Sequence, residues 1–147
     1  MEVSLLLNVK GLRFPLDRKY YTKNGAHLWL KQEGNLVKIG MDAFAAEMLG
    51  FLTFLSVTKR HVKSEEAIGS LESSKFISKF YSPISGKIIA VNDQVLSNPR
   101  KINDSPYDSW VLAMKPDNKV YEGKYIIEES DEILRWISKE IKRLKSD

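Results

Sequence analysis

Residues 71–86 read LESSKFISKFYSPISG, two short runs of residues separated by a pair of serines. The second run, KFISKFY, is rich in branched and aromatic residues, which favour strands. Serine favours tight turns. The segment therefore predicts a β-hairpin with Lys75 beside its turn, and it sets the expectation of a β fold for the sequence around it.

Short strand-like stretches continue on both sides of this hairpin. HLWLK at residues 27–31 alternates polar and apolar residues, and GNLVKIG follows it with Gly34 and Asn35 at a turn. Further stretches of this kind are FLTFLSV (51–57), IGSLES (68–73), GKIIAVN (86–92) and, as the last strand, WVLAMK (110–115). Short strands at close spacing predict a compact β-sandwich or barrel.

Helical patterns are few. In MDAFAAEMLG (41–50), Asp42 is placed to cap a short helix and Gly50 to end it. DQVLSNP (93–99) predicts one helical turn, whereas RKINDSPYDS (100–109) has the composition of a loop. From Ser130 the sequence predicts a helix that packs on the sheet through one apolar stripe, formed by Ile133, Trp136, Ile137, Ile141 and Leu144.

The length of 147 residues predicts a single domain over residues 1–147, with a core of about 20–115 and a C-terminal helix of about 130–145. The sequence has no cysteine, which excludes disulfides, thiolate metal sites and a cysteine nucleophile. The opening VSLLLNV is too short for a signal peptide, and no apolar run reaches the length of a membrane span. We therefore expect a cytoplasmic protein without a membrane partner.

The residue inventory argues against an active site of the protein's own. Neither of the two histidines lies in a catalytic motif, and both the Gly-x-Ser-x-Gly pattern and a phosphate-binding glycine loop are absent. With two histidines and no cysteine, a metal site would need scattered carboxylates. The net charge of +4 is modest, and aromatic and basic residues do not interleave as in nucleic-acid-binding motifs. We expect no catalytic residue, no metal and no nucleic-acid partner.

A lysine beside a rigid turn can instead serve as an attachment point. Its amine can be acylated, which converts a charged side chain into a neutral amide arm. Ser73 and Ser74 are small, so they allow a tight turn and the close approach of a second protein. The reactive group of such a carrier would belong to an attached cofactor rather than to an amino-acid side chain.

Residues 69–110 resemble the H protein of the glycine cleavage system, a lipoyl carrier. Family members resemble G-x-x-E-S-x-K-A, then Y-x-P-x-S-G-x-[IV]-x-x-V-N, then a short helix, a proline, N-x-x-P-Y and a tryptophan. Upstream, YTKNGAHLWL resembles YTKEHEWV, and VKIGMDAFAAEMLG resembles VGITDYAQEQLG. The resemblance covers about residues 20–115. The matching residues are Gly69, Glu72, Ser73, Lys75, Tyr81, Pro83, Ser85, Gly86, Val91, Asn92, Pro99, Asn103, Pro106, Tyr107 and Trp110.

The resemblance implies a mainly β fold, a β-sandwich of the lipoyl/biotinyl-domain type (a flattened barrel) with short helices and a C-terminal α-helix. It implies lipoate joined by an amide to Lys75, in a hairpin recognised through Glu72, Ser73 and Ser74. The carrier, which is not itself an enzyme and which we expect to be a monomer, would shuttle an aminomethyl group between glycine decarboxylase, aminomethyltransferase and dihydrolipoyl dehydrogenase. A lipoate ligase or lipoyl transferase would attach the cofactor.

Three alternatives stay open at this point. Biotin carriers share the general fold, but their lysine lies between methionines, whereas Lys75 lies between Ser74 and Phe76. A sister family of lipoate-binding proteins works with a heterodisulfide-reductase-like complex in sulfur oxidation. This alternative stays open because the sequence differs from the H-protein pattern at positions such as Phe76, where alanine is usual. The third alternative is an unmodified binding module that uses its basic helix or exposed Phe76 and Phe80.

The remaining residues of the pattern have structural interpretations. Gly69, Pro83 and Gly86 are interpreted as turn formers, Trp29 and Trp110 as core, and Lys79 as an ordinary strand lysine.

Overall fold

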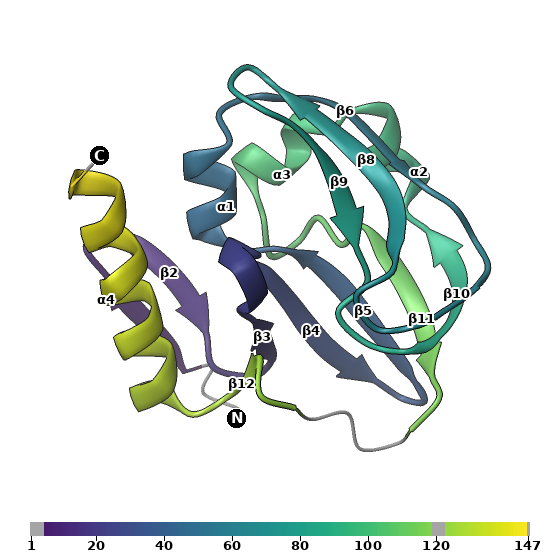
Figure 1. Cartoon of the computed structure of the whole chain (residues 1–147), viewed down its shortest axis with the longest axis horizontal. Coiled ribbons are helices and arrows are strands. Elements are labelled where there is room, and N and C mark those ends of the chain that lie inside the picture. The colour runs from purple at the N-terminus through teal and green to yellow at the C-terminus, as the bar shows by residue number, and fades with distance from the viewer. Residues whose placement is uncertain (1–4, 119–122, 147) are drawn as a thin grey trace.

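The computed structural model describes residues 5–118 and 123–146 (Figure 1). The strands are β1 (Leu6–Val9), β2 (Leu12–Pro15), β3 (Lys19–Tyr21), β4 (Leu28–Glu33), β5 (Leu36–Met41), β6 (Leu52–Val57), β7 (His61–Val62), β8 (Ala67–Ser73), β9 (Ile77–Tyr81), β10 (Gly86–Val91), β11 (Leu112–Pro116) and β12 (Ile126–Ile127). The helices are α1 (Ala43–Met48), α2 (Asp93–Ser97), α3 (Arg100–Asp104) and α4 (Ser130–Ser146), with a 3₁₀ turn η1 (Lys23–Gly25) before β4.

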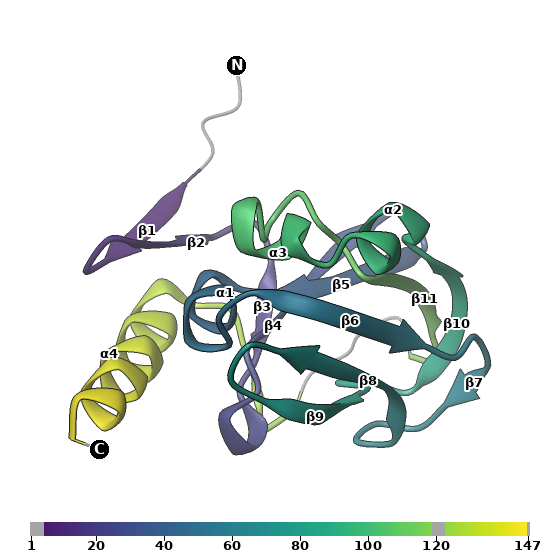
Figure 2. The same cartoon turned by 90° about the horizontal axis from the view of Figure 1, so that it is seen from above.

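Two antiparallel sheets form the body of the molecule. The larger has the strand order β12-β3-β4-β5-β11-β10-β7, and the smaller has the order β6-β8-β9. Figures 1 and 2 show the smaller sheet covering one face of the larger, with α1, α2 and α3 around one end and α4 off to the side. The prediction of a mainly β sandwich with short helices and a C-terminal helix is therefore confirmed.

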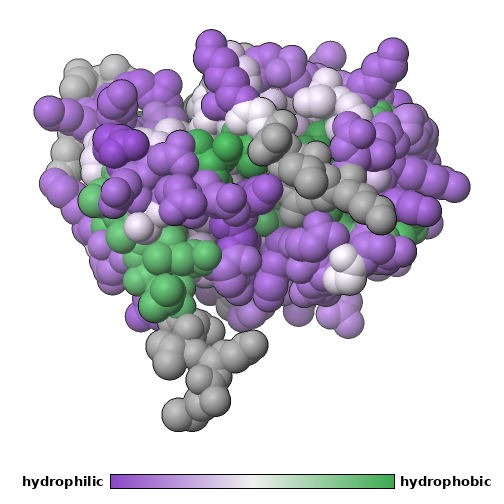
Figure 3. All heavy atoms as spheres, turned by 90° about the horizontal axis from the view of Figure 1, so that it is seen from below, coloured by the Kyte–Doolittle hydropathy of each residue, from purple (hydrophilic) through white to green (hydrophobic). Residues whose placement is uncertain are grey.

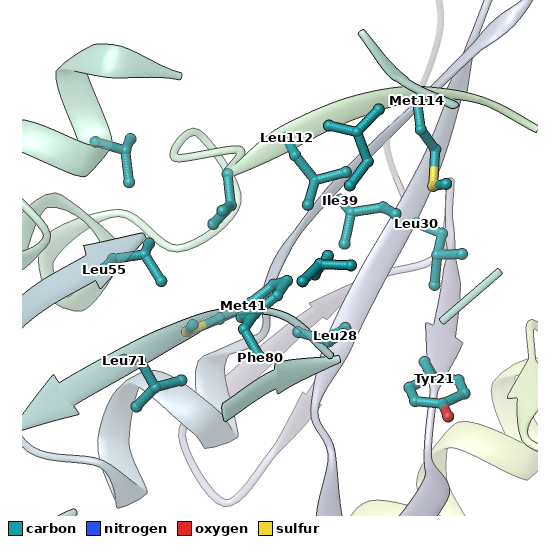
Figure 4. Packing of buried hydrophobic residues seen from close by; sticks show 14 of the residues in the cluster. Tyr21, Leu28, Leu30, Ile39, Met41, Leu55, Leu71, Phe80, Leu112 and Met114 are labelled. Atoms are coloured by element: carbon teal, nitrogen blue, oxygen red, sulfur yellow. The ribbon is translucent and has the colours of Figure 1, made fainter. Parts of the chain in front are cut away.

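The main core fills the space between the two sheets. Alternate residues of β4 and β5, including Leu30 and Ile39, face Leu55 and Leu71 of the smaller sheet, and all four are buried (Figure 4). This arrangement follows from the two-residue period of a strand, which sends every second side chain to the same face. The alternation in HLWLK thus predicts the correct face for Leu28 and Leu30.

A second cluster lies on the other face of the larger sheet, beneath α4 and the β1–β2 hairpin. Ile133 and Ile137 of α4 are fully buried there, whereas Leu144 is 45% exposed, so the predicted stripe holds for the first part of the helix. The β1–β2 hairpin was not predicted; it adds Val9 and Phe14 to this cluster. Trp29 is buried as core, as predicted, and Trp110 is partly buried against the same cluster.

Gly69 and Gly86 are strand residues, so their interpretation as turn formers is wrong. Gly69 lies within β8, where a Cβ atom would overlap the carbonyl oxygen of Ser56 in β6. Gly86 begins β10, where a Cβ atom would overlap the carbonyl oxygen of Lys115 in β11. Both glycines allow two strands to approach closely, which is the second common use of glycine in a sheet.

Two further expectations differ from the structure. Residues 100–104 form α3 rather than a loop, because Ile102 is buried in the main core and stabilises a short helix there. WVLAMK is not the last strand, since β12 follows it and pairs with β3. The predicted helix after Asp42 is confirmed as α1, and Gly50 follows it with a φ of +72°.

Within the described ranges, the structure has no helix with the length and apolar character needed to cross a membrane. The face seen from below in Figure 3 is largely covered by hydrophilic side chains, with smaller hydrophobic areas between them.

Candidate functional site

The turn between β8 and β9 brings together the residues that the sequence singled out. β8 ends at Ser73 and β9 begins at Ile77, so Lys75 lies at the tip of the hairpin, and its side chain is exposed. The Ser73 hydroxyl accepts hydrogen bonds from the backbone N–H groups of Lys75 (3.3 Å) and Phe76 (3.0 Å). The Ser73 N–H in turn donates to the Phe76 carbonyl at 2.8 Å. The serine side chain therefore stabilises the tight turn directly.

The tip is also joined to the rest of the fold. The N–H of Ser74 donates to the carbonyl oxygen of Phe51 at 3.0 Å. Asn103 of α3 then holds the segment before β6: its amide donates to the carbonyls of Ala46 (2.9 Å) and Gly50 (2.7 Å), and its side-chain oxygen accepts from Leu52 N–H (2.9 Å). The sequence pattern included Asn103 without assigning it a task. The structure shows that its side chain connects α1, α3 and β6 behind the tip.

Glu72 lies in the middle of a row of side chains across the smaller sheet. It pairs with Phe54 of β6 on one side and with Ile77 of β9 on the other. All three side chains are exposed. The hairpin therefore presents one carboxylate flanked by apolar groups, three residues before Lys75 in the sequence.

Lys79 and Phe80 lie further along β9. Lys79 pairs with Ser70 and lies inside β9, as the sequence predicted, and it is exposed. Phe80 is only 3% exposed and belongs to the main core. The proposal that an exposed Phe80 could hold a partner is therefore wrong, whereas Phe76 is exposed as that proposal required.

A buried charged cluster, which sequence reasoning missed, lies away from the tip beneath α4. The Nδ1 atom of His27 lies 3.1 Å from Asp42 and its Nε2 atom lies 3.1 Å from Glu140. Its ring stacks on that of Trp136 and contacts the tilted ring of Phe44. We call these five residues the His27 cluster. Asp42 also caps α1 by accepting a hydrogen bond from the Ala45 N–H.

Opposing effects act on the charge of this histidine. Burial disfavours the charged ring, but the adjacent Asp42 and Glu140 carboxylates outweigh burial and raise the pKa of His27 to about 9. The hydrogen bond from His27 likewise holds the pKa of Glu140 below its usual value. The cluster therefore contains an imidazolium between two carboxylates at neutral pH. It joins α4 to the segment before β4, and its contacts are structural.

The other candidates for a functional site are metal-binding groups and surface hollows. Among the described residues, no group of three or more histidine or acidic side chains is arranged to hold a metal ion. One surface hollow of about 310 Å³ is lined by residues such as Tyr21, Glu65 and Tyr125. Another of about 350 Å³ lies between the β1–β2 hairpin and α3. Neither lining includes the turn from Ser73 to Phe76.

The sequence of this chain is similar to those of known proteins. The sequence profile described as glycine cleavage H-protein matches residues 18–137 of the chain. A protein of Sulfurisphaera tokodaii named "Probable glycine cleavage system H protein 3" is 38% identical over 116 residues, which are 77% of this chain and 83% of that protein.

This chain belongs to the glycine cleavage H-protein family.

Other members of the H-protein family agree in sequence and in fold. The "Glycine cleavage system H protein" of Bordetella avium is 37% identical over 117 residues, 78% of this chain and 91% of that protein. The crystal structure of a glycine cleavage system H protein from Mycobacterium marinum has a TM-score of 0.71 and 28% identity, and it covers 86% of this chain and 98% of that one. The matched profile takes in both sheets and the first half of α4, and the hairpin carrying Lys75 lies within it.

Proposed function

We propose that this protein is a lipoyl carrier of the glycine cleavage system, with lipoate joined by an amide to Lys75. The observation that carries the proposal is the exposed Lys75 side chain at the tip of a hairpin whose turn is held by the Ser73 hydroxyl. Membership of the H-protein family supports the same assignment. Glu72, Ser73 and Ser74 would form the surface by which the attaching enzyme recognises the turn.

The residues present fit an acylated lysine. In this step the deprotonated Nζ of Lys75 would attack the carbonyl carbon of lipoyl-adenylate, which a ligase would make from lipoate and ATP with release of pyrophosphate. The new N–C bond would replace the bond to the phosphate oxygen, AMP would depart, and the amine would give up one proton. Such a step requires an accessible amine and a backbone that does not obstruct the enzyme, and the exposed tip provides both.

Once bound, lipoate would supply a dithiolane whose S–S bond opens as it accepts an aminomethyl group, and the dithiol left after that group departs would be reoxidised to the ring by the dehydrogenase. The chain itself would hold the root of that arm in place and present it in turn to glycine decarboxylase, aminomethyltransferase and dihydrolipoyl dehydrogenase. No side chain of the hairpin is arranged as a nucleophile with its own base, so we propose a carrier rather than an enzyme. The protein's contribution is positional, through the hydrogen bonds at Ser73, Ser74 and Asn103.

Intact mass after co-expression with a lipoate ligase tests the attachment site. The wild-type protein gains the mass of one lipoyl group, and Lys75→Arg gains none. Lys79→Arg is the matched control, because Lys79 is an exposed lysine four positions further along the same hairpin, and it should be modified like the wild type. Loss of labelling in Lys79→Arg alone would show that the attachment site is Lys79. No gain in mass over the unmodified chain in any of the three proteins would favour the unmodified binding module.

Reconstitution separates the two carrier functions. The lipoylated protein, mixed with glycine decarboxylase, aminomethyltransferase and dihydrolipoyl dehydrogenase, should support release of carbon dioxide from glycine. A protein that is fully lipoylated but inert in this assay would contradict the glycine cleavage assignment. That outcome would favour the sulfur-carrying role with a heterodisulfide-reductase-like complex.

A further inference from the structure

Four exposed apolar residues lie in or beside the hairpin end that carries Lys75. Phe51 is 56% exposed and accepts the hydrogen bond from Ser74 N–H, so it lies against the turn. Phe76, 46% exposed, follows Lys75 in the turn itself. Phe54 (46%) and Ile77 (82%) flank Glu72 on the neighbouring strands. We call these four residues the apolar collar: Phe51, Phe54, Phe76 and Ile77.

A β-bulge in β6 directs Phe54 outward. The pairing with β8 shifts between Leu52 and Phe54, so that Thr53 is the additional residue. Leu52 is fully buried, and in a regular strand Phe54, two positions later, would point to the same buried face. The bulge reverses this direction and places an aromatic ring in solvent beside Glu72. Bulges of this kind commonly re-aim a side chain next to a functional site.

The charges around the collar indicate the chemistry of a partner. Glu72 lies between Phe54 and Ile77, so any protein that covers those two side chains also removes Glu72 from water. A buried carboxylate is costly unless a cation pairs with it. The fitting partner surface is therefore apolar and carries one lysine or arginine opposite Glu72. On the side of Phe51, the guanidinium of Arg100 lies 4.2 Å from the ring centroid, so the collar has a basic border there.

We propose that the apolar collar is the docking surface for the lipoate ligase that acylates Lys75, and that Phe54 and Ile77 are specificity-determining residues for that enzyme. The inference rests on the proposed function and names the contacts that attachment requires. The collar is an exposed, grouped set of large apolar side chains, which in soluble proteins marks an interaction site.

The distance from the turn to the reacting atom distinguishes the ligase from the other proposed partners. Before modification, the reacting atom is Nζ, which extends from the turn by the length of one lysine side chain. A ligase must therefore bring its active site to the turn, where it meets the collar. Enzymes that act on the dithiolane work at the far end of a much longer arm and can do so without covering the residues around the turn.

Steady-state lipoylation kinetics with purified ligase, lipoate and ATP test this inference, with the unmodified protein as the varied substrate. Ile77→Thr removes apolar contact area at a side chain that is 82% exposed, so folding should be unaffected. We expect KM to rise about tenfold with kcat little changed, since the lost contact is one of binding. Ile89→Thr is the matched control, because Ile89 is 43% exposed but lies in β10 of the other sheet. Its KM should equal that of the wild type.

Binding without chemistry provides a second readout. In a Lys75→Arg background, which cannot be acylated, titration of the ligase against Ile77→Thr and Phe54→Thr should give weaker affinity than against the Ile89→Thr control. Unchanged KM and affinity in the collar variants, with normal lipoylation of the wild type, would overturn the docking surface and leave the carrier function standing. Absence of lipoylation at Lys75 in the wild type would instead overturn the proposed function itself.

Discussion

The Lys75 hairpin and the His27 cluster each hold a basic side chain on a well-fixed backbone, but in opposite surroundings. Lys75 is exposed, and the groups around it serve the backbone of its turn. His27 is 3% exposed, and two carboxylates and two aromatic rings surround its side chain. The difference teaches that the neighbours of a basic group, rather than its type, decide whether it holds the fold together or stays exposed to solvent.

The largest expected effect lies on the buried side of this comparison. Asp42→Ala leaves the His27 charge with one partner and removes the cap of α1, so we expect a loss of about 3–5 kcal/mol in the free energy of unfolding. Urea unfolding followed by circular dichroism measures it. Lys75→Ala, at the exposed site, should change the same quantity by less than about 0.5 kcal/mol.

Asp42→Asn separates the two tasks of this residue. The asparagine oxygen can still cap α1, so this variant should recover about 1 kcal/mol relative to Asp42→Ala. Equal stabilities of the two variants would mean that the cap contributes nothing beyond the charge.

The next largest effect is a dependence of the free energy of unfolding on pH, caused by the His27 cluster. Because the pKa of His27 is raised to about 9 from an ordinary value of 6.5, its stabilising contribution is complete only below about pH 6.5 and is lost as pH rises through 9. A raised pKa of this size corresponds to about 3 kcal/mol. Urea unfolding of the wild type between pH 6 and pH 9.5 should show a loss of that order.

His27→Gln is the reference for this measurement, because it removes the titrating ring while other groups titrate as before. The difference in stability between wild type and variant should shrink toward high pH. Parallel stability curves for the two proteins would show that His27 does not carry the effect.

The smallest effect concerns the turn itself. Ser73→Ala removes the acceptor for the Lys75 and Phe76 N–H groups, which lie at an exposed site, so we expect a cost of only about 0.5–1 kcal/mol. Amide hydrogen exchange by NMR should show faster exchange at Phe76. Ser74→Ala keeps the backbone bond to Phe51 and should leave global stability unchanged. Protection of the Phe76 amide that survives in Ser73→Ala would show that the hydroxyl does not hold the turn.

Local patterns predict the hairpin, most strands and α4 because those signals lie within a few neighbouring residues. The β1–β2 hairpin escaped prediction, although its turn at Lys10 and Gly11 has two positive φ values of 51° and 87°, and a glycine at such a position is a hairpin signal. Its stability comes from packing near α4, more than a hundred residues further along the chain.

The surroundings of Lys75 were predicted less completely than the fold. The position of Lys75 follows from the turn chemistry around it, whereas the outward direction of Phe54 depends on a bulge that only the pairing with β8 reveals. The His27 cluster could not be predicted locally either, since Glu140 lies 113 positions from His27. Alternation of residues would place Phe54 with the buried Leu52, so a rule based on period alone gives the wrong face.

Asn103 helps to fix the end of the hairpin relative to the rest of the fold. Through Gly50 and Phe51, its side chain connects the turn that bears Lys75 to α3. A tethered arm sweeps a volume whose centre is its anchor, and the effective concentration of its free end at a neighbouring active site falls as that volume grows. For the arm proposed at Lys75, a fixed anchor would confine the sweep to the length of the arm, so an enzyme docked on the carrier would meet the free end of the arm at a concentration that the carrier's own geometry sets.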